Sequence, residues 1–360
     1  MKDVTLLCLG SGLASRYKEN TLQILALPPG TRIQFRYTAD IIPDGLRQNL
    51  ESSAIRGANV LLGHVDCTER GRGPDGYCRI VPCRYGNLIR SFRVGSVFVL
   101  QFELGDFAVT NDLDALQRNL PPSRPRWEEV NGGKTLKGAW CQELPAAFQA
   151  CARSNDMADW QKTISDLAKC EDFSGQPYYY HVLGIFERGF ESPVELKNGE
   201  CVLRSNKDYE LRVLHWDPSA DSHTGHKETQ WLKLDALEPW LEIRTSPLLA
   251  IDCPYDVGSV EIRTGSVSRK EHGLLVLRDD ENGHPQNRIK VELCLPVKVK
   301  GTIVRTVLYG IALGTLLTSQ QLIAIFSNKD VQAAVPLTIA AIALGMGTGL
   351  LLALGISKPL

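Results

Sequence analysis

The hydrophobic and polar positions of this 360-residue chain divide it into a long β-patterned part and a uniformly apolar end. Over residues 1–110, short apolar or alternating runs are separated by clusters of turn residues, which is typical of strands. The strands expected here span residues 4–9, 22–27, 32–38, 59–67, 78–83 and 97–104. Short strands at regular spacing favour a small barrel or sandwich over a βαβ fold.

The middle of the chain is more polar and predicts short helices separated by a proline-rich linker at residues 121–125. The expected helices span residues 111–119, 145–151 and 156–170. Asn111 or Asp112 is expected to cap the first helix, since short polar side chains accept hydrogen bonds from free helical N–H groups. In the third helix, Trp160, Ile164 and Leu167 follow the spacing of one helical face.

From residue 178 the β pattern returns and predicts an antiparallel sandwich of about seven strands. The expected strands span residues 178–186, 200–203, 209–215, 231–234, 241–244, 257–263, 274–278 and 289–295. The fold class is therefore mainly β. The predicted domains are a β-rich domain over 1–110, a mixed or helical connector over 111–176, an antiparallel β-sandwich over 177–300 and a final segment over 301–360.

The final segment contains two apolar runs, residues 306–326 and 331–356, separated only by residues 327–330. An α-helix needs about 20 apolar residues to cross a bilayer core. Neither run contains an acidic, basic or histidine residue. The pattern predicts a two-helix transmembrane hairpin, with the membrane as a partner of the protein.

The flanking charges and the N-terminus predict how this hairpin is oriented. Lys298, Lys300 and Arg305 precede the first run and Lys358 follows the second, so the positive-inside rule places both ends in the cytoplasm. The N-terminal apolar stretch is about six residues long and does not read as a signal peptide. Ten cysteines without a paired framework fit a reducing compartment. We expect a multi-pass inner-membrane protein with both termini cytoplasmic.

Small residues recur at every fourth position in both apolar runs and give each run a smooth helix face. They are Gly310 and Gly314 in the first run and Ala341, Gly345, Gly349 and Ala353 in the second. Gln320 and Gln321 add polar amides that need partners or water. Packing of the two helices within one chain and packing between chains both fit this pattern, and the second arrangement predicts a homo-oligomer.

Arginine and aromatic residues gather in the first β-rich domain and form the candidate ligand-binding set. This set consists of Arg36, Tyr37, Arg79, Arg84 and Tyr85. Guanidinium groups pair with phosphate oxygens and aromatic rings stack on bases, so a nucleotide or phosphorylated ligand is one interpretation. A solvated face of a sheet is the alternative interpretation.

Metal and catalytic patterns are weak. Two sets of potential ligands occur, namely Cys67, Cys78 and Cys83 beside His64, and His223 and His226 beside Asp217 and Asp221. The first set lacks the paired C-x2-C spacing of structural zinc sites and favours core cysteines, and the second favours a solvated loop. Gly-x-Ser-x-Gly, His-Glu-x-x-His and Walker lysine motifs are all absent from the sequence. We therefore expect no cofactor and no enzyme, with a membrane-tethered hydrolase using dispersed residues around His64 and Asp66, or around His223 and His226, as an alternative.

In overall layout, a β-rich module followed by a two-helix membrane module, the chain resembles the membrane-acting effectors of bacterial anti-phage defence systems. The resemblance lies in architecture and assigns no residue a role. It implies a sensor and effector whose β domains bind a ligand, a cytoplasmic protein partner or a nucleoprotein complex, and whose hairpin self-associates to perturb the membrane. The alternative is a hairpin-anchored scaffold or adaptor that recruits a protein complex to the inner membrane surface.

Overall fold

The computed structural model describes residues 6–110, 112–120, 125–131, 139–144, 151–218, 230–251, 253–267, 269–279 and 291–301. Within these ranges the chain is mainly β with few helices, which confirms the predicted class. Three sheets of seven, six and four strands account for the β structure. The predicted domain boundaries stay predictions.

The first sheet has the strand order β2-β5-β4-β3-β1-β6, with β7 paired to β5. Its strands are β1 (Leu6–Ser11), β2 (Arg32–Thr38), β3 (Asn59–Asp66), β4 (Arg79–Val94), β5 (Val97–Val109), β6 (Ala139–Glu143) and β7 (Ala152–Ser154). β1 and β3 are parallel, whereas the other pairs are antiparallel. Since β2 stands at the end of this order, no strand of the described chain is hydrogen-bonded to its second long side.

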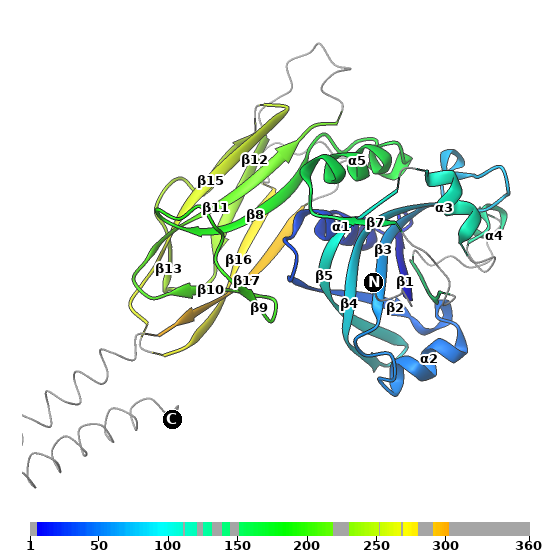
Figure 1. The fold of residues 1–360 in the computed structure, drawn as a ribbon, viewed down its shortest axis with the longest axis horizontal. Helices are drawn as coiled ribbons and strands as arrows, with labels where there is room; N and C mark the ends of the chain where they lie inside the picture. The colour runs from blue at the N-terminus through cyan, green and yellow to red at the C-terminus, as the bar shows by residue number, and fades with distance from the viewer. Residues whose placement is uncertain are drawn as a thin grey trace, which may run out of the picture.

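Residues 22–27, predicted as a strand, belong mostly to helix α1 (Ser15–Ala26), so that prediction was wrong. The buried residues of α1 include Tyr17, Thr21, Ile24 and Leu25, which lie one or two helical turns apart. The apolar run at residues 22–27 forms the C-terminal half of a buried helical face that begins at Tyr17. By itself the run is too short to distinguish a helical period from that of a strand. α1 lies between the first sheet and strands β8 (Tyr179–Glu187) and β17 (Glu292–Lys300) (Figure 1).

The other helices are short and cover the first sheet. They are α2 (Asp44–Glu51), α3 (Leu113–Asn119), α4 (Trp127–Asn131) and α5 (Met157–Ala168), with 3-10 turns η1 (Ala39–Ile41), η2 (Glu69–Gly71) and η3 (Glu171–Phe173). Asp112 caps α3 as predicted, because its side chain accepts a hydrogen bond from the Ala115 N–H at 2.8 Å. Trp160 and Ile164 in α5 are fully buried, which confirms the predicted helical stripe. Residues 145–150 lie outside the described ranges.

The second half of the chain forms two sheets, ordered β14-β12-β16-β17-β10-β9 and β13-β15-β11-β8. Besides β8 and β17, the strands are β9 (Leu196–Lys197), β10 (Glu200–Arg204), β11 (Asp208–Trp216), β12 (Gln230–Ala236), β13 (Leu241–Ile243), β14 (Leu248–Ile251), β15 (Tyr255–Thr264) and β16 (Glu271–Asp279). Their buried side chains share one core as a β-sandwich. The pairing of β10 with β17 is parallel, so the predicted purely antiparallel pattern needs correction there.

The predicted localisation as a multi-pass inner-membrane protein is corrected on one finding. In the part of the chain that the structure describes, no helix combines the length and the apolar composition that crossing a bilayer requires. The two apolar runs at 306–326 and 331–356 lie outside the described residues. The same holds for the predicted packing residues Gly310, Gly314, Gln320, Gln321, Ala341, Gly345, Gly349 and Ala353.

Candidate anion-binding groove

An open groove of about 440 Å³ lies where α1, β2 and β17 meet. A volume of this size is in the usual range for ligand sites. The groove is lined by Arg16, Glu19, Asn20, Gln23 and Leu27 at α1, by Arg32, Ile33, Gln34 and Arg36 from β2, and by Cys294 from β17. Because β17 belongs to the sandwich and β2 to the first sheet, the groove is shared by both halves of the molecule.

Periodicity explains why the polar side chains of two elements meet in this groove. On α1, Arg16, Asn20 and Gln23 lie three to four residues apart and so share one face of the helix. On β2, the buried and open positions alternate from Arg32 to Thr38, which leaves Arg32, Gln34 and Arg36 on the more exposed side. The same alternation turns Phe35 toward the core.

Tyr17 connects two of the arginines. The Arg16 Nη2 group donates a hydrogen bond to the Tyr17 hydroxyl at 2.8 Å, and the Arg16 guanidinium lies over the Tyr17 ring at 4.6 Å. The Tyr17 hydroxyl in turn donates to the backbone carbonyl of Arg36 at 3.0 Å. Tyr17 is 1% exposed and stacks on Tyr37, so its position is fixed by the core. The groove therefore holds the Arg16 guanidinium in one place before any ligand arrives, which reduces the entropy lost on binding.

The arginines of the groove keep unused hydrogen-bond donors. Among the described residues, the Arg36 side chain makes no ion pair and no hydrogen bond. Arg32 is 3.7 Å from the Glu103 carboxylate, and its buried Nε group has no hydrogen-bond partner. Glu19 is the only acidic residue among those that line the groove in the described chain. Three guanidinium groups against the two carboxylates of Glu19 and Glu103 leave the groove with a positive potential that favours anions.

The five residues of the candidate ligand-binding set do not share one surface. Arg36 lines the groove, but Tyr37 and Arg84 are both fully buried. Tyr85 is buried against the opposite face of the sheet, where its hydroxyl donates to the Cys151 carbonyl. Arg79 is half-buried at the start of β4, opposite Asp66. A ligand-binding role for this set stays a prediction, and the geometry favours it only for Arg36.

Sequence reasoning missed Arg16 because the first half of α1 carries no apolar run. The sequence nevertheless contains a helical pattern, because the apolar and small residues from Tyr17 to Leu25 recur with helical spacing. This pattern places Arg16 and Asn20 on the same helix. Reading residues 22–27 as a strand separated them from this face.

Arg84 has a structural role that its sequence context did not reveal. Its guanidinium donates to the carbonyl oxygens of Ile24 at 2.8 Å and of Gly105 at 2.7 Å, and also to that of Leu27. Ile24 and Leu27 lie at the C-terminal end of α1, where carbonyls lack helical partners and a positive charge is favourable. Burial lowers the pKa of Arg84 to about 9. Arg84 thus fixes the helix that forms one wall of the groove.

A second buried charge cluster joins β3, η3 and α1. His64 Nε2 is 3.1 Å from the Asp172 carboxylate, and Lys18 Nζ is 3.4 Å from it. Burial raises the pKa of Asp172, but the hydrogen bond from His64 and the charge of Lys18 outweigh it and hold the pKa below its usual value. Asp172 packs on Gly12, where an added Cβ would lie 1.6 Å from its Oδ1 atom.

The three cysteines considered as metal ligands in the first β-rich domain lie in the hydrophobic core. Cys67, Cys78 and Cys83 are all buried there. In the described ranges, no group of three or more His, Cys, Asp and Glu side chains is placed to hold a metal ion. His223 and His226 lie outside these ranges.

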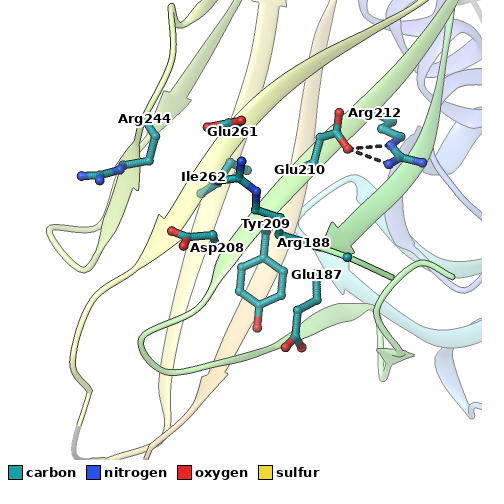
Figure 2. Close-up of a pocket in the computed structure, with 10 residues that line it drawn as sticks. Glu187, Arg188, Asp208, Tyr209, Glu210, Arg212, Arg244, Glu261 and Ile262 are labelled. Atoms are coloured by element: carbon teal, nitrogen blue, oxygen red, sulfur yellow. Dashed lines mark hydrogen bonds and ion pairs between the residues drawn. The ribbon is translucent and has the colours of Figure 1, made fainter. Parts of the chain in front are cut away.

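A second pocket of about 230 Å³ lies on the four-stranded sheet, with Tyr209 and Ile262 among its lining residues (Figure 2). Most of its charged groups are already paired. The pairs are Arg212 with Glu210 at 2.7 Å, Lys207 with Glu187 at 2.9 Å and Arg244 with Glu242 at 3.0 Å. This pocket therefore offers a ligand fewer unused charges than the groove at α1.

No protein-family model matches the sequence, and no curated protein matches it either. Among solved structures, a Bacteroides ovatus GH5 xyloglucanase in complex with a XXXG heptasaccharide matches with a TM-score of 0.17 and 7% identity, over 28% of this chain and 17% of that one. The periplasmic chaperone SfaE matches with a TM-score of 0.20 and 9% identity, over 29% and 56%. The chain thus spans less than two thirds of either structure, and likenesses this distant carry no argument about function.

Proposed function

We propose that this protein is a binding protein of the sensor or adaptor type, which recognises an anionic ligand or partner in the groove between α1, β2 and β17. One observation carries the proposal. Arg16 and Arg36 come from two elements, are joined through Tyr17 and retain unused N–H donors within the described chain. A guanidinium offers five donors in a planar fork that matches phosphate and carboxylate oxygens.

The position of the groove supports a sensing role. A ligand there would touch β2 of the first sheet and Cys294 of the sandwich at the same time. A ligand that contacts both halves of a molecule can bind one of their arrangements more tightly than another and so shift the equilibrium between them. We infer that the first sheet acts as a small barrel-like recognition module and the β-sandwich as the part that responds.

The adaptor alternative uses the same groove with an acidic surface of a protein partner in place of a small ligand. Catalysis is not part of this proposal: among the described residues the groove lining contains no His, and its Cys294 thiol, 3.9 Å from the Glu292 carboxylate, has a pKa raised by burial. The likeness to anti-phage effectors and a nucleotide as the ligand stay predictions.

Calorimetric titration of the full chain with ATP and with pyrophosphate tests the proposal. We expect binding of at least one probe, weakened about tenfold or more by Arg36→Glu because a repulsive carboxylate replaces a charge-assisted donor. Arg56→Glu is the matched control, since Arg56 is exposed on a different part of the molecule. If Arg36→Glu and Arg56→Glu weaken binding equally, the assignment of the groove is contradicted. The same holds if neither variant weakens binding.

A further inference from the structure

We infer that the occupant of the groove is an extended acidic peptide segment, which adds as a strand to the open edge of β2. This inference rests on the proposed function, because it names the class of anion that the groove binds. Two independent observations carry it, the direction of the backbone groups of β2 and the spacing of its arginines.

The backbone of β2 has hydrogen-bonding groups directed away from the sheet. β2 stands at the end of the strand order and pairs with β5, with Phe35 opposite Leu100. The Arg36 carbonyl points away from β5, because it accepts a hydrogen bond from Tyr17 on α1. The Thr31 carbonyl points the other way and accepts from the Leu104 N–H at 2.9 Å. Since alternate residues of an antiparallel strand direct their backbone groups to the same side, those of Arg32 and Gln34 also point away from β5, and they are the groups left for an added strand because Tyr17 already occupies the Arg36 carbonyl.

The arginines of β2 are spaced for an extended ligand. Arg32 and Arg36 are four residues apart, which corresponds to about 13 Å along a strand. A peptide strand beside β2 has the same repeat, so acidic side chains four residues apart would meet both guanidinium groups. A single phosphate group does not span this distance. The charge complementarity is therefore distributed along β2 and matches a strand in length.

The remaining lining favours a peptide over a nucleic acid. Asn20 and Gln34 present carboxamides that, within the described chain, have no hydrogen-bond partner and match the N–H and C=O groups of a peptide. No aromatic side chain lines the groove in the described part of the chain, whereas single-stranded nucleic acids are held largely by base stacking on aromatic rings. Glu19 disfavours an unbroken row of phosphates but tolerates a peptide whose acidic residues are spaced apart.

The test uses the full chain and a fluorescein-labelled nonapeptide with glutamate at every second position. We expect micromolar binding that Arg36→Glu weakens tenfold or more and Arg56→Glu leaves unchanged. A peptide N-methylated at the amides that would face β2 should bind at least tenfold more weakly, because strand addition depends on backbone hydrogen bonds. Amide hydrogen exchange of Gln34 should slow when the unmodified peptide binds.

Three results would overturn the inference and leave the proposed function intact. These are equal binding of the two peptides, tighter binding of an octathymidine oligonucleotide than of the acidic peptide, and binding of pyrophosphate without any binding of the peptide. If neither the peptide, the oligonucleotide nor pyrophosphate binds, the proposed function itself is wrong.

Discussion

The hydroxyl of Tyr17 donates a hydrogen bond to the backbone carbonyl of Arg36 at 3.0 Å, and this contact joins helix α1 to the edge strand β2. The same hydroxyl accepts a hydrogen bond from Arg16 at 2.8 Å. One buried phenol therefore orients an arginine on the helix and anchors the strand that carries the second arginine. The groove depends on this contact for its shape and for the placement of its charges.

The variant Tyr17→Phe should separate the contribution of the Tyr17 hydroxyl from that of its ring. The ring still packs on Tyr37, but both hydrogen bonds are lost, so we expect a loss of about 1 kcal/mol in the free energy of unfolding in urea. Binding of the acidic peptide should weaken three- to tenfold, because Arg16 is no longer held in place. Tyr255→Phe serves as the control, since Tyr255 is 51% exposed. Unchanged peptide affinity in Tyr17→Phe would show that Tyr17 does not organise the groove.

Replacing Arg84 by Met should destabilise the fold by about 3 kcal/mol. The carbonyls of Ile24, Leu27 and Gly105 would remain buried without their donor, and each unsatisfied group is costly. Urea denaturation measures the change, with Arg118→Met as the control because Arg118 is 68% exposed. Equal stability of both variants would mean that these carbonyls find other donors and that Arg84 does not fix α1.

His181 should make the fold sensitive to acid. Burial and the nearby Arg84 lower the pKa of His181 to about 4, from 6.5. Between these values the unfolded chain binds a proton that the folded protein excludes. The contribution of His181 is therefore complete above pH 6.5 and is lost as the pH falls toward 4, with a total of about 3 kcal/mol.

The free energy of unfolding of His181→Gln should accordingly fall less between pH 7 and pH 4 than that of the unchanged protein. His272→Gln is the control, because the His272 side chain is 53% exposed. An NMR titration gives a second measurement that does not depend on the variant: the His181 ring should stay neutral at pH 5. A midpoint near 6.5 for His181 would contradict its burial against Leu25.

Gly12 should not tolerate a side chain. An added methyl group would lie 1.6 Å from Asp172 Oδ1, so Gly12→Ala must displace the carboxylate from His64 and Lys18. We expect a loss of about 2 kcal/mol in the free energy of unfolding. Gly45→Ala is the matched control, since an added Cβ meets nothing within 4 Å there and alanine favours the helix that contains it. Similar stability of the two variants would show that the Asp172 cluster shifts at little cost.

The sequence predicted the strands of this protein well where side chains alternate. β2 was predicted at its observed bounds, Arg32–Thr38, because its buried and exposed positions follow a strict period of two. α5 was predicted from Trp160, Ile164 and Leu167, which the core indeed buries. In these elements the local pattern and the tertiary environment agree.

The candidate site was predicted only in part, for physical reasons. Arg36 lies on the exposed face of β2 and lines the groove, whereas the burial of Arg84 was not foreseen. Hydrophobicity places an arginine at the surface, whereas three backbone carbonyls from distant segments surround this one. Arg16 was missed because its position depends on the packing of α1 between the first sheet and the sandwich. Contacts between segments far apart in sequence leave no mark on local periodicity.

The most direct test of the proposal that this groove binds anions is the dissociation constant of the full chain for the labelled acidic peptide, compared with that of the Arg16→Glu/Arg36→Glu double variant. We predict that the double variant binds at least 30-fold more weakly, while urea denaturation shows the fold retained and the unchanged chain loses affinity as salt rises. An affinity within threefold of the unchanged chain, with the same dependence on salt, would contradict the central claim.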